Sequence, residues 1–195
     1  ADLTKESDVQ ALESKISNLD ILVNNAGMTS VTSPASEAEA TDISQLSLEA
    51  LRVGMSRNLE TAFLTTKYFL PKIRKSKSGR IIMISSLTGP VMAMRNQPVY
   101  ATAKAALVGL TKSIALDGRA FNIACSQLDI GNADTAIGSR FKEGVPQASG
   151  EIKPEPVIDP DECGRVIAYM SQLPLNTNIL NMTLMATNMP FVGRG

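Results

Sequence analysis

The sequence predicts an α/β domain in which a parallel sheet lies between layers of helices. Three short apolar runs carry this prediction: "DILVNNAG" at 20–27, "GRIIMISS" at 79–86 and "NIACSQLDIG" at 122–131. Each run is continuous rather than alternating, which is typical of a strand buried on both faces. Longer segments with apolar residues at helical spacing separate the runs, so right-handed crossovers between parallel strands are expected. A chain of 195 residues has the size of one domain, and we expect residues 1–195 to form it.

Four segments have helical spacing, and most are bounded by a start or stop signal. Ser7 and Gln10 form a capping-box pair near the start of the first helix. Pro71 is expected to stop the second helix, and Asp159 followed by Pro160 starts the fourth. The expected helices are 8–18, 48–69, 97–117 and 159–173.

Two segments between these elements are too polar or too interrupted for the core. Residues 28–45 are mostly small and polar, which predicts a long loop. Residues 133–158 contain several glycines and prolines, which predicts a mobile substrate flap over 136–156. A last strand is expected near 179–186.

The composition excludes several classes of site and partner. The chain has no histidine, so a Ser-His-Asp triad and His-based metal sites are excluded, and its two cysteines cannot form a thiolate metal cage. Lys+Arg and Asp+Glu are equal at 19 each, and the one dense basic run is 72–80, so no nucleic-acid partner is expected. We recognise no signal peptide and no apolar run of about 18 residues. We therefore expect a cytoplasmic protein with no metal site and no membrane partner.

Tyr100 and Lys104 form the first candidate pair for acid–base chemistry. Residues four apart in a helix share one face, and an ammonium near a phenol favours the phenolate, which would lower the pKa of Tyr100. Such a pair alone is common on ordinary helix surfaces. The context favours a function, because Ser85 and Ser86 directly follow the apolar run of a buried strand. Ligands of open α/β sheets bind beyond the carboxyl ends of the strands.

Five motifs stand in the order found in one enzyme family: "NNAG" at 24–27, "RNLETAF" at 57–63, "GRIIMISSLTG" at 79–89, "YATAK" at 100–104 and "DIGNADT" at 129–135. The sequence resembles the short-chain dehydrogenase/reductase family, and in particular its 3-oxoacyl-(acyl-carrier-protein) reductase-like members. The resemblance implies a three-layer, Rossmann-like, doubly wound parallel sheet. It also implies an oxidoreductase that transfers a hydride between NAD or NADP and a small carbonyl or secondary alcohol substrate.

The resemblance places the catalytic set at Asn58, Ser86, Tyr100 and Lys104. Ser86 would donate a hydrogen bond to the substrate carbonyl oxygen, and Tyr100 would transfer the proton. Lys104 would hold the nicotinamide ribose and lower the pKa of Tyr100. Asn58 would interrupt its helix and hold a water that connects Lys104 to solvent. Without the family context, Asn58 is equally an interior polar residue satisfied by the backbone, and Ser86 a turn former after a strand.

The same resemblance implies cofactor contacts from the start of the chain to the end of the third strand. Asn25 is expected to brace neighbouring strands. Gly131 would still let the backbone come close to the cofactor, although Ile130 stands where the family usually has proline. The expected cofactor-binding residues are Asp2, Asn24, Ala26, Gly27, Tyr100, Lys104, Gly131 and Thr135.

The family's glycine-rich turn after a first strand is absent from this sequence, whose first glycine is Gly27. We expect residues 1–3 to be the tail of a third strand, with the first two βα units missing, so that residues 21–24 form an open edge. Two alternatives to the oxidoreductase remain. One is an isomerase or lyase on the same fold, and the other is a truncated, cofactor-free chain that acts as an oligomer partner or regulator.

Two further expectations concern surfaces. A homodimer or homotetramer is expected to form through helices 48–70 and 97–117. The substrate pocket is expected to be lined by the 136–156 flap together with Met92, Met94 and Phe141.

Overall fold

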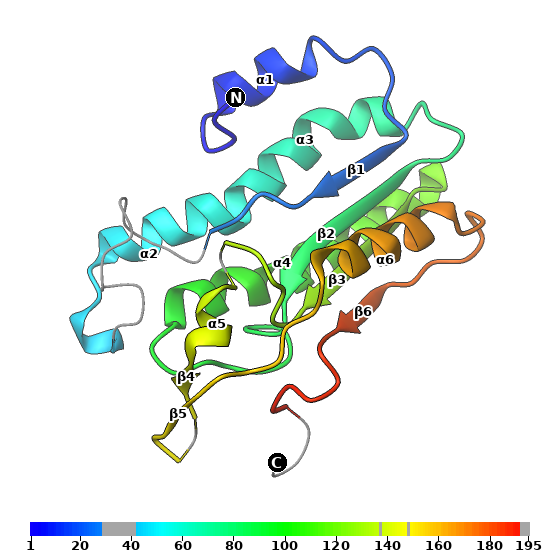
Figure 1. Cartoon of the computed structure of the whole chain (residues 1–195). Helices are drawn as coiled ribbons and strands as arrows, with labels where there is room; N and C mark the ends of the chain where they lie inside the picture. The colour runs from blue at the N-terminus through cyan, green and yellow to red at the C-terminus, as the bar shows by residue number, and fades with distance from the viewer. Residues whose placement is uncertain (29–41, 137, 148, 192–195) are drawn as a thin grey trace.

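The computed structural model of the chain describes residues 1–28, 42–136, 138–147 and 149–191. Its centre is a parallel sheet with the strand order β1-β2-β3-β6. The strands are β1 Ile21–Asn24, β2 Arg80–Ser86, β3 Ala124–Ile130 and β6 Asn181–Leu184. All four arrows point toward the side of the molecule that carries α5 and the β4–β5 hairpin (Figure 1). The four predicted strands are confirmed, but β1 and β6 are four residues long, half the length of the segments expected to contain them.

Helices cover both faces of the sheet, which confirms the three-layer architecture. They are α1 Glu6–Glu13, α2 Leu48–Met55, α3 Thr61–Ile73, α4 Pro98–Gly118 and α6 Pro160–Gln172. Alternate residues of β2 separate the two halves of the core, because successive strand residues point to opposite faces. Ile81 and Met83 pack with residues of α1, α3 and α4, whereas Ile82 and Ile84 pack with Met170 of α6. In Figure 1, α6 accordingly lies in front of the sheet and α4 behind it.

The outer edge of β1 is open among the described residues, as predicted. Ile21 is 39% exposed and Val23 is 38% exposed. The expectation of a strand tail at residues 1–3 is wrong, because Asp2 starts a turn instead. Its carbonyl accepts from the Lys5 N–H and its carboxylate accepts from the Thr4 N–H.

The first two helices differ from prediction at their ends. The helix α1 starts at Glu6 after Lys5, so the Ser7–Gln10 capping box is wrong, and it ends at Glu13 rather than at residue 18. The helix α3 continues past Pro71 to Ile73, where a stop was expected. Ile73 is fully buried in the core, and this packing holds the last turn in place despite the proline.

The single helix expected over 48–69 is interrupted. A π-helical turn, η3 Ser56–Glu60, separates α2 from α3 and carries Asn58. The helix α2 is capped by the Ser47 hydroxyl, which accepts from the Ala50 N–H. The predicted loop over 28–45 falls largely on residues 29–41, which lie outside the described residues, and ends in the short 3-10 helix η2 Ile43–Gln45.

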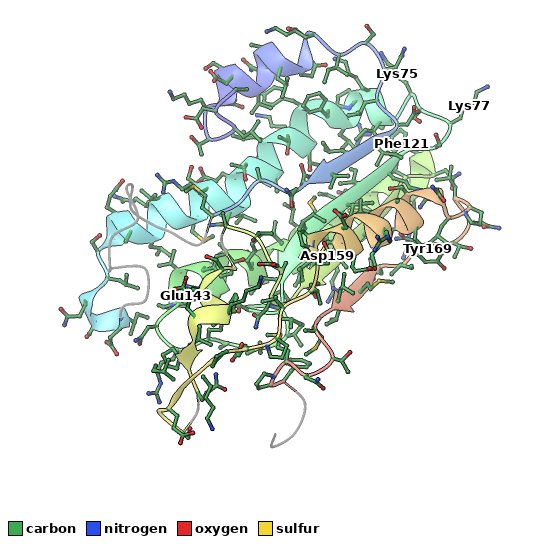
Figure 2. All side chains as sticks on the ribbon, viewed as in Figure 1. Lys75, Lys77, Phe121, Glu143, Asp159 and Tyr169 are labelled. Atoms are coloured by element: carbon green, nitrogen blue, oxygen red, sulfur yellow. The ribbon has the colours of Figure 1, made fainter. Side chains whose placement is uncertain are left out.

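The segment predicted to be an irregular flap contains short regular elements. These are α5 Arg140–Glu143 and an antiparallel hairpin of β4 Val145–Pro146 with β5 Ile152–Lys153. Phe141 and Val145 are buried and anchor the segment on the domain. Farther along, the Asp159 side chain caps α6 as predicted, and Figure 2 shows this residue before the first turn of the helix. Mobility of the flap remains a prediction.

The helix α4, with the 3-10 turn η4 Arg119–Phe121, is long and apolar enough to cross a membrane by length and composition. The sequence-based expectation overlooked this run. Here α4 packs on β2 and β3 through Leu107 and carries the buried Lys104, which is typical of the central helix of an α/β domain.

Candidate active site

A cleft with a volume of about 170 Å³ opens beyond the carboxyl ends of the parallel strands. The loop after β1 brings Gly27 to it, the end of β2 brings Ser86, and the first turns of α4 bring Tyr100 and Lys104. Three of the four predicted catalytic residues therefore line one cleft. The far wall consists of the segment after β3 and of α5.

Lys104 is the buried cation of the cleft, with only 5% of its surface exposed. Its Nζ donates to the carbonyl of Ile84 at 3.1 Å and lies 5.8 Å from the centroid of the Tyr100 ring. Burial lowers the pKa of Lys104 from the usual 10.5 to about 8, and the negative charge of Asp129 opposes this shift. Lys104 is therefore mostly charged at neutral pH but close to its titration range.

Tyr100 has a raised pKa, because burial disfavours the phenolate. A hydrogen bond with Ser86 and the positive charge of Arg140 act in the opposite direction. The prediction that Lys104 lowers the pKa of Tyr100 below its ordinary value is therefore wrong for this structure. The sequence showed the spacing of the two residues, whereas the desolvation of the phenol arises from tertiary packing.

Ser86 lines the same cleft as Tyr100. Its Oγ accepts from the Thr88 N–H at 3.1 Å, which fixes the hydroxyl at the end of β2. Ser85 is buried one position earlier and donates a long hydrogen bond of 3.4 Å to the carbonyl of Lys104. Both serines line the cleft, and the choice of Ser86 over Ser85 stays a prediction.

Asn58 lies behind the cleft rather than in its wall, and it is 2% exposed. Its Oδ1 accepts from the Met28 N–H at 2.9 Å, and its Nδ2 donates to the Gly54 carbonyl at 3.1 Å. The π-helical turn is the local interruption expected at this residue, and it is common at functional positions. A Cβ on Gly27 would lie 3.0 Å from Asn58 Oδ1 and 3.3 Å from Lys104 Nζ. Gly27 thus lets Asn58 and Lys104 approach each other.

The two asparagines of "NNAG" exchange the roles expected for them. Asn24 is buried, and its amide donates to Thr66 Oγ1 at 2.9 Å and accepts from Thr65 Oγ1 at 2.7 Å. These bonds hold β1 against α3, and a further contact from Asn24 Nδ2 to Met83 Sδ at 3.2 Å reaches β2, so Asn24 makes the brace between strands that was expected for Asn25. Asn25 is exposed and lines the cleft, so it takes the position expected for Asn24.

The other expected cofactor and pocket residues are distributed unevenly. Gly131, Thr135, Met94 and Phe141 line the cleft, whereas Asp2, Ala26 and Met92 are not among the cleft-lining residues. Asp2 lies in the turn before α1. Met92 packs against the core cluster of Leu87, Ala186 and Met189. Its expected place in the pocket wall is therefore wrong.

Two charged residues near the cleft were not singled out from the sequence. Asp129 is 1% exposed, and its carboxylate accepts from Gln127 Nε2 at 2.6 Å and from Asn181 Nδ2 at 2.8 Å. Arg140 lies in the cleft wall, and its Nε is buried without a hydrogen-bond acceptor among the described residues. The motif "DIG" contains Asp129 and could have drawn attention to it, whereas the sequence around Arg140 carries no comparable signal.

Comparison with known sequences identifies the family. A sequence model described as short chain dehydrogenase matches residues 1–145. "Dehydrogenase/reductase SDR family member 6" of Aquarana catesbeiana is 36% identical over 153 residues, which cover 78% of this chain and 58% of that protein. "Oxidoreductase UcpA" of Salmonella typhimurium is 30% identical over 188 residues, covering 88% of this chain and 66% of that protein. The chain thus spans between half and two thirds of the length of these relatives.

Comparison with solved structures supports the fold. An alcohol dehydrogenase from the archaeon Thermococcus sibiricus, complexed with 5-hydroxy-NADP, superposes with a TM-score of 0.76 at 19% identity. That match covers 96% of this chain and 73% of the other. Serine dehydrogenase from Escherichia coli gives a TM-score of 0.76 at 18% identity, with 98% and 76% coverage.

Proposed function

Because the chain belongs to the short-chain dehydrogenase/reductase family, we propose that it carries the active site of a nicotinamide-dependent oxidoreductase. The reaction would interconvert a carbonyl group and a secondary alcohol. One observation carries the proposal: Ser86, Tyr100 and Lys104 meet in a single cleft beyond the strand ends. This is the place where open α/β sheets bind ligands.

The residues around the cleft fit the nicotinamide end of NAD or NADP. Gly27 leaves the space between the end of β1 and Lys104 free of a side chain. Lys104 has three N–H donors and gives one to Ile84, so two remain for the hydroxyl pair of a ribose. Asn25 and Thr135 bring an amide and a hydroxyl to the rim. When bound, the cofactor would supply a hydride to the substrate carbonyl carbon or accept it from the alcohol.

The proton in this scheme belongs to Tyr100. Burial raises the pKa of the phenol, so Tyr100 is neutral at pH 7 and can give its proton to the carbonyl oxygen during reduction. The Ser86 hydroxyl would donate a hydrogen bond to the same oxygen. The charged Lys104 would stabilise the phenolate left on Tyr100, and its pKa of about 8 suits proton exchange near neutrality. We propose that a water held by Asn58 returns a proton to Lys104.

Replacement of the phenol tests this function. Tyr100→Phe removes the proton but keeps the ring, and we expect the rate to fall by about 100-fold or more in both directions. Tyr169→Phe is the matched control, because Tyr169 is 57% exposed on α6 and labelled there in Figure 2. The measurement is the change in nicotinamide absorbance with a panel of ketones and alcohols. Retention of turnover within a few fold in Tyr100→Phe would refute the role.

We propose a small-molecule substrate for the reaction, as is usual in this family. We also propose that copies of the chain assemble through α3 and α4. Phe63 and Leu116 on these helices are 51% and 59% exposed and offer apolar surface that a second copy could cover.

A further inference from the structure

Arg140 is an uncompensated cation in the wall of the cleft. It lies on α5, next to Phe141, and its guanidinium carbon is 5.3 Å from the centroid of that ring. Its Nε is sealed from solvent and has no hydrogen-bond acceptor among the described residues. A buried donor without an acceptor is costly, and more so when it is charged, so such groups are rare in native structures.

The acidic side chains near Arg140 are engaged elsewhere or form no pair with it. Asp134 pairs with Lys142, and Glu155 accepts from Asn132 and Gln147. Glu143, labelled on α5 in Figure 2, lies three residues away on the same short helix and forms no ion pair with Arg140. Within the described part of the chain the positive charge thus has no carboxylate partner.

Arg140 also lies close to the reacting groups. Its charge lowers the pKa of Tyr100 against the effect of burial, so the guanidinium and the phenol are within electrostatic range. Both side chains line the same small cleft, together with Ser86. One small substrate could therefore contact both residues, with its reacting oxygen at Tyr100 and another of its groups at Arg140.

We propose that Arg140 binds a carboxylate of the substrate, and that the substrates of this site are small hydroxy acids and oxo acids. This inference rests on the proposed function for its reaction, although the anion-binding step stands without it. A guanidinium presents a planar fork of N–H donors that matches a carboxylate in two parallel bonds. The carboxylate would bind the guanidinium from the side that faces the cleft and neutralise its charge.

A turnover experiment measures the role of Arg140 through the substrate charge. We would assay 2-, 3- and 4-hydroxypentanoate beside their methyl esters, which keep the shape and lose the charge. In Arg140→Gln we expect kcat/KM for the preferred acid to fall about 10- to 100-fold, the loss typical of a charged hydrogen-bond pair, while that for its ester changes less than threefold. Arg140→Lys should recover part of the loss. Lys142→Gln, on the same short helix, is the control for a general charge effect.

A binding experiment separates this inference from the proposed function, because it needs no turnover. Pentanoate at saturation should raise the Tm of the wild-type chain by about 5 °C and leave that of Arg140→Gln unchanged. Pentanamide should raise neither. Three results for Arg140→Gln would each overturn the assignment. The first is an equal loss of kcat/KM for acid and ester, and the second is a change confined to the KM of the nicotinamide cofactor. The third is the same effect of pentanoate on the Tm of this variant and of the wild-type chain. If Tyr100→Phe remains active but pentanoate still distinguishes the two chains, the proposed reaction fails and the anion site stands.

Discussion

Gly89 joins the end of β2 to the helix that carries Tyr100 and Lys104, and its replacement by alanine gives a strong test of the fold around the site. Its φ is +107°, a conformation that L residues rarely adopt. A Cβ at this position would lie 2.3 Å from the carbonyl oxygen of Ala101 and 2.8 Å from the N–H nitrogen of Ala105. These two atoms belong to residues of α4 that directly follow Tyr100 and Lys104 in the chain. The helix and the loop would have to separate by about 1 Å to restore ordinary contact.

The expected loss of stability has two parts. A positive φ costs an L residue about 1–2 kcal/mol, and overpacking against backbone costs about 1–3 kcal/mol. Gly89→Ala should therefore lower the free energy of unfolding by about 2–5 kcal/mol. The rate should also fall on the order of 100-fold, because a shift of about 1 Å in a catalytic group has that effect.

Gly109→Ala is the matched control on the same helix. A Cβ on Gly109 would meet no atom within 4 Å, and alanine has the higher helix propensity. We expect this variant to gain about 0.5–1 kcal/mol. Urea unfolding followed by circular dichroism measures both changes, since the chain has no tryptophan for fluorescence. If Gly89→Ala stays within about 0.5 kcal/mol of wild type while Gly109→Ala gains stability, the close approach is refuted.

Two further predictions concern the pH dependence of stability. The pKa of Lys104 is about 8 in the fold and 10.5 ordinarily, so between these values the unfolded chain binds more protons and stability rises with pH. Lys104→Met should lack this rise, which reaches about 1.4 kcal/mol per pH unit. The prediction is contradicted if the free energy of unfolding changes with pH in the same way in both chains. Asp129→Asn removes the carboxylate that favours the charged lysine, so the rise should begin at a lower pH than in the wild type. An unchanged onset in urea titrations at several pH values would show that the two groups do not interact.

The sequence predicted the sheet and the meeting of Ser86, Tyr100 and Lys104 in one cleft because both depend on local patterns. Continuous apolar runs marked the buried strands, and the spacing of Tyr100 and Lys104 placed both on α4. The errors concern packing. Burial sets the pKa of Tyr100, and the contacts of Thr65 and Thr66 decide that Asn24 faces α3. Neither effect can be read from residues adjacent in the chain.

The two cations beside Tyr100 differ in how their charges are compensated, and this difference separates their roles. Lys104 donates to a backbone carbonyl and is favoured in its charged form by Asp129, so its charge already has partners before a substrate enters. Arg140 has no such partner, so a bound carboxylate would cancel the effect by which it lowers the pKa of Tyr100. The phenol would then hold its proton more firmly in the complex with an acid than in the complex with an ester. On this proposal, the charge of the substrate acts on the proton donor through Arg140, whose charge a substrate carboxylate would neutralise, and not through Lys104, whose charge the protein itself compensates.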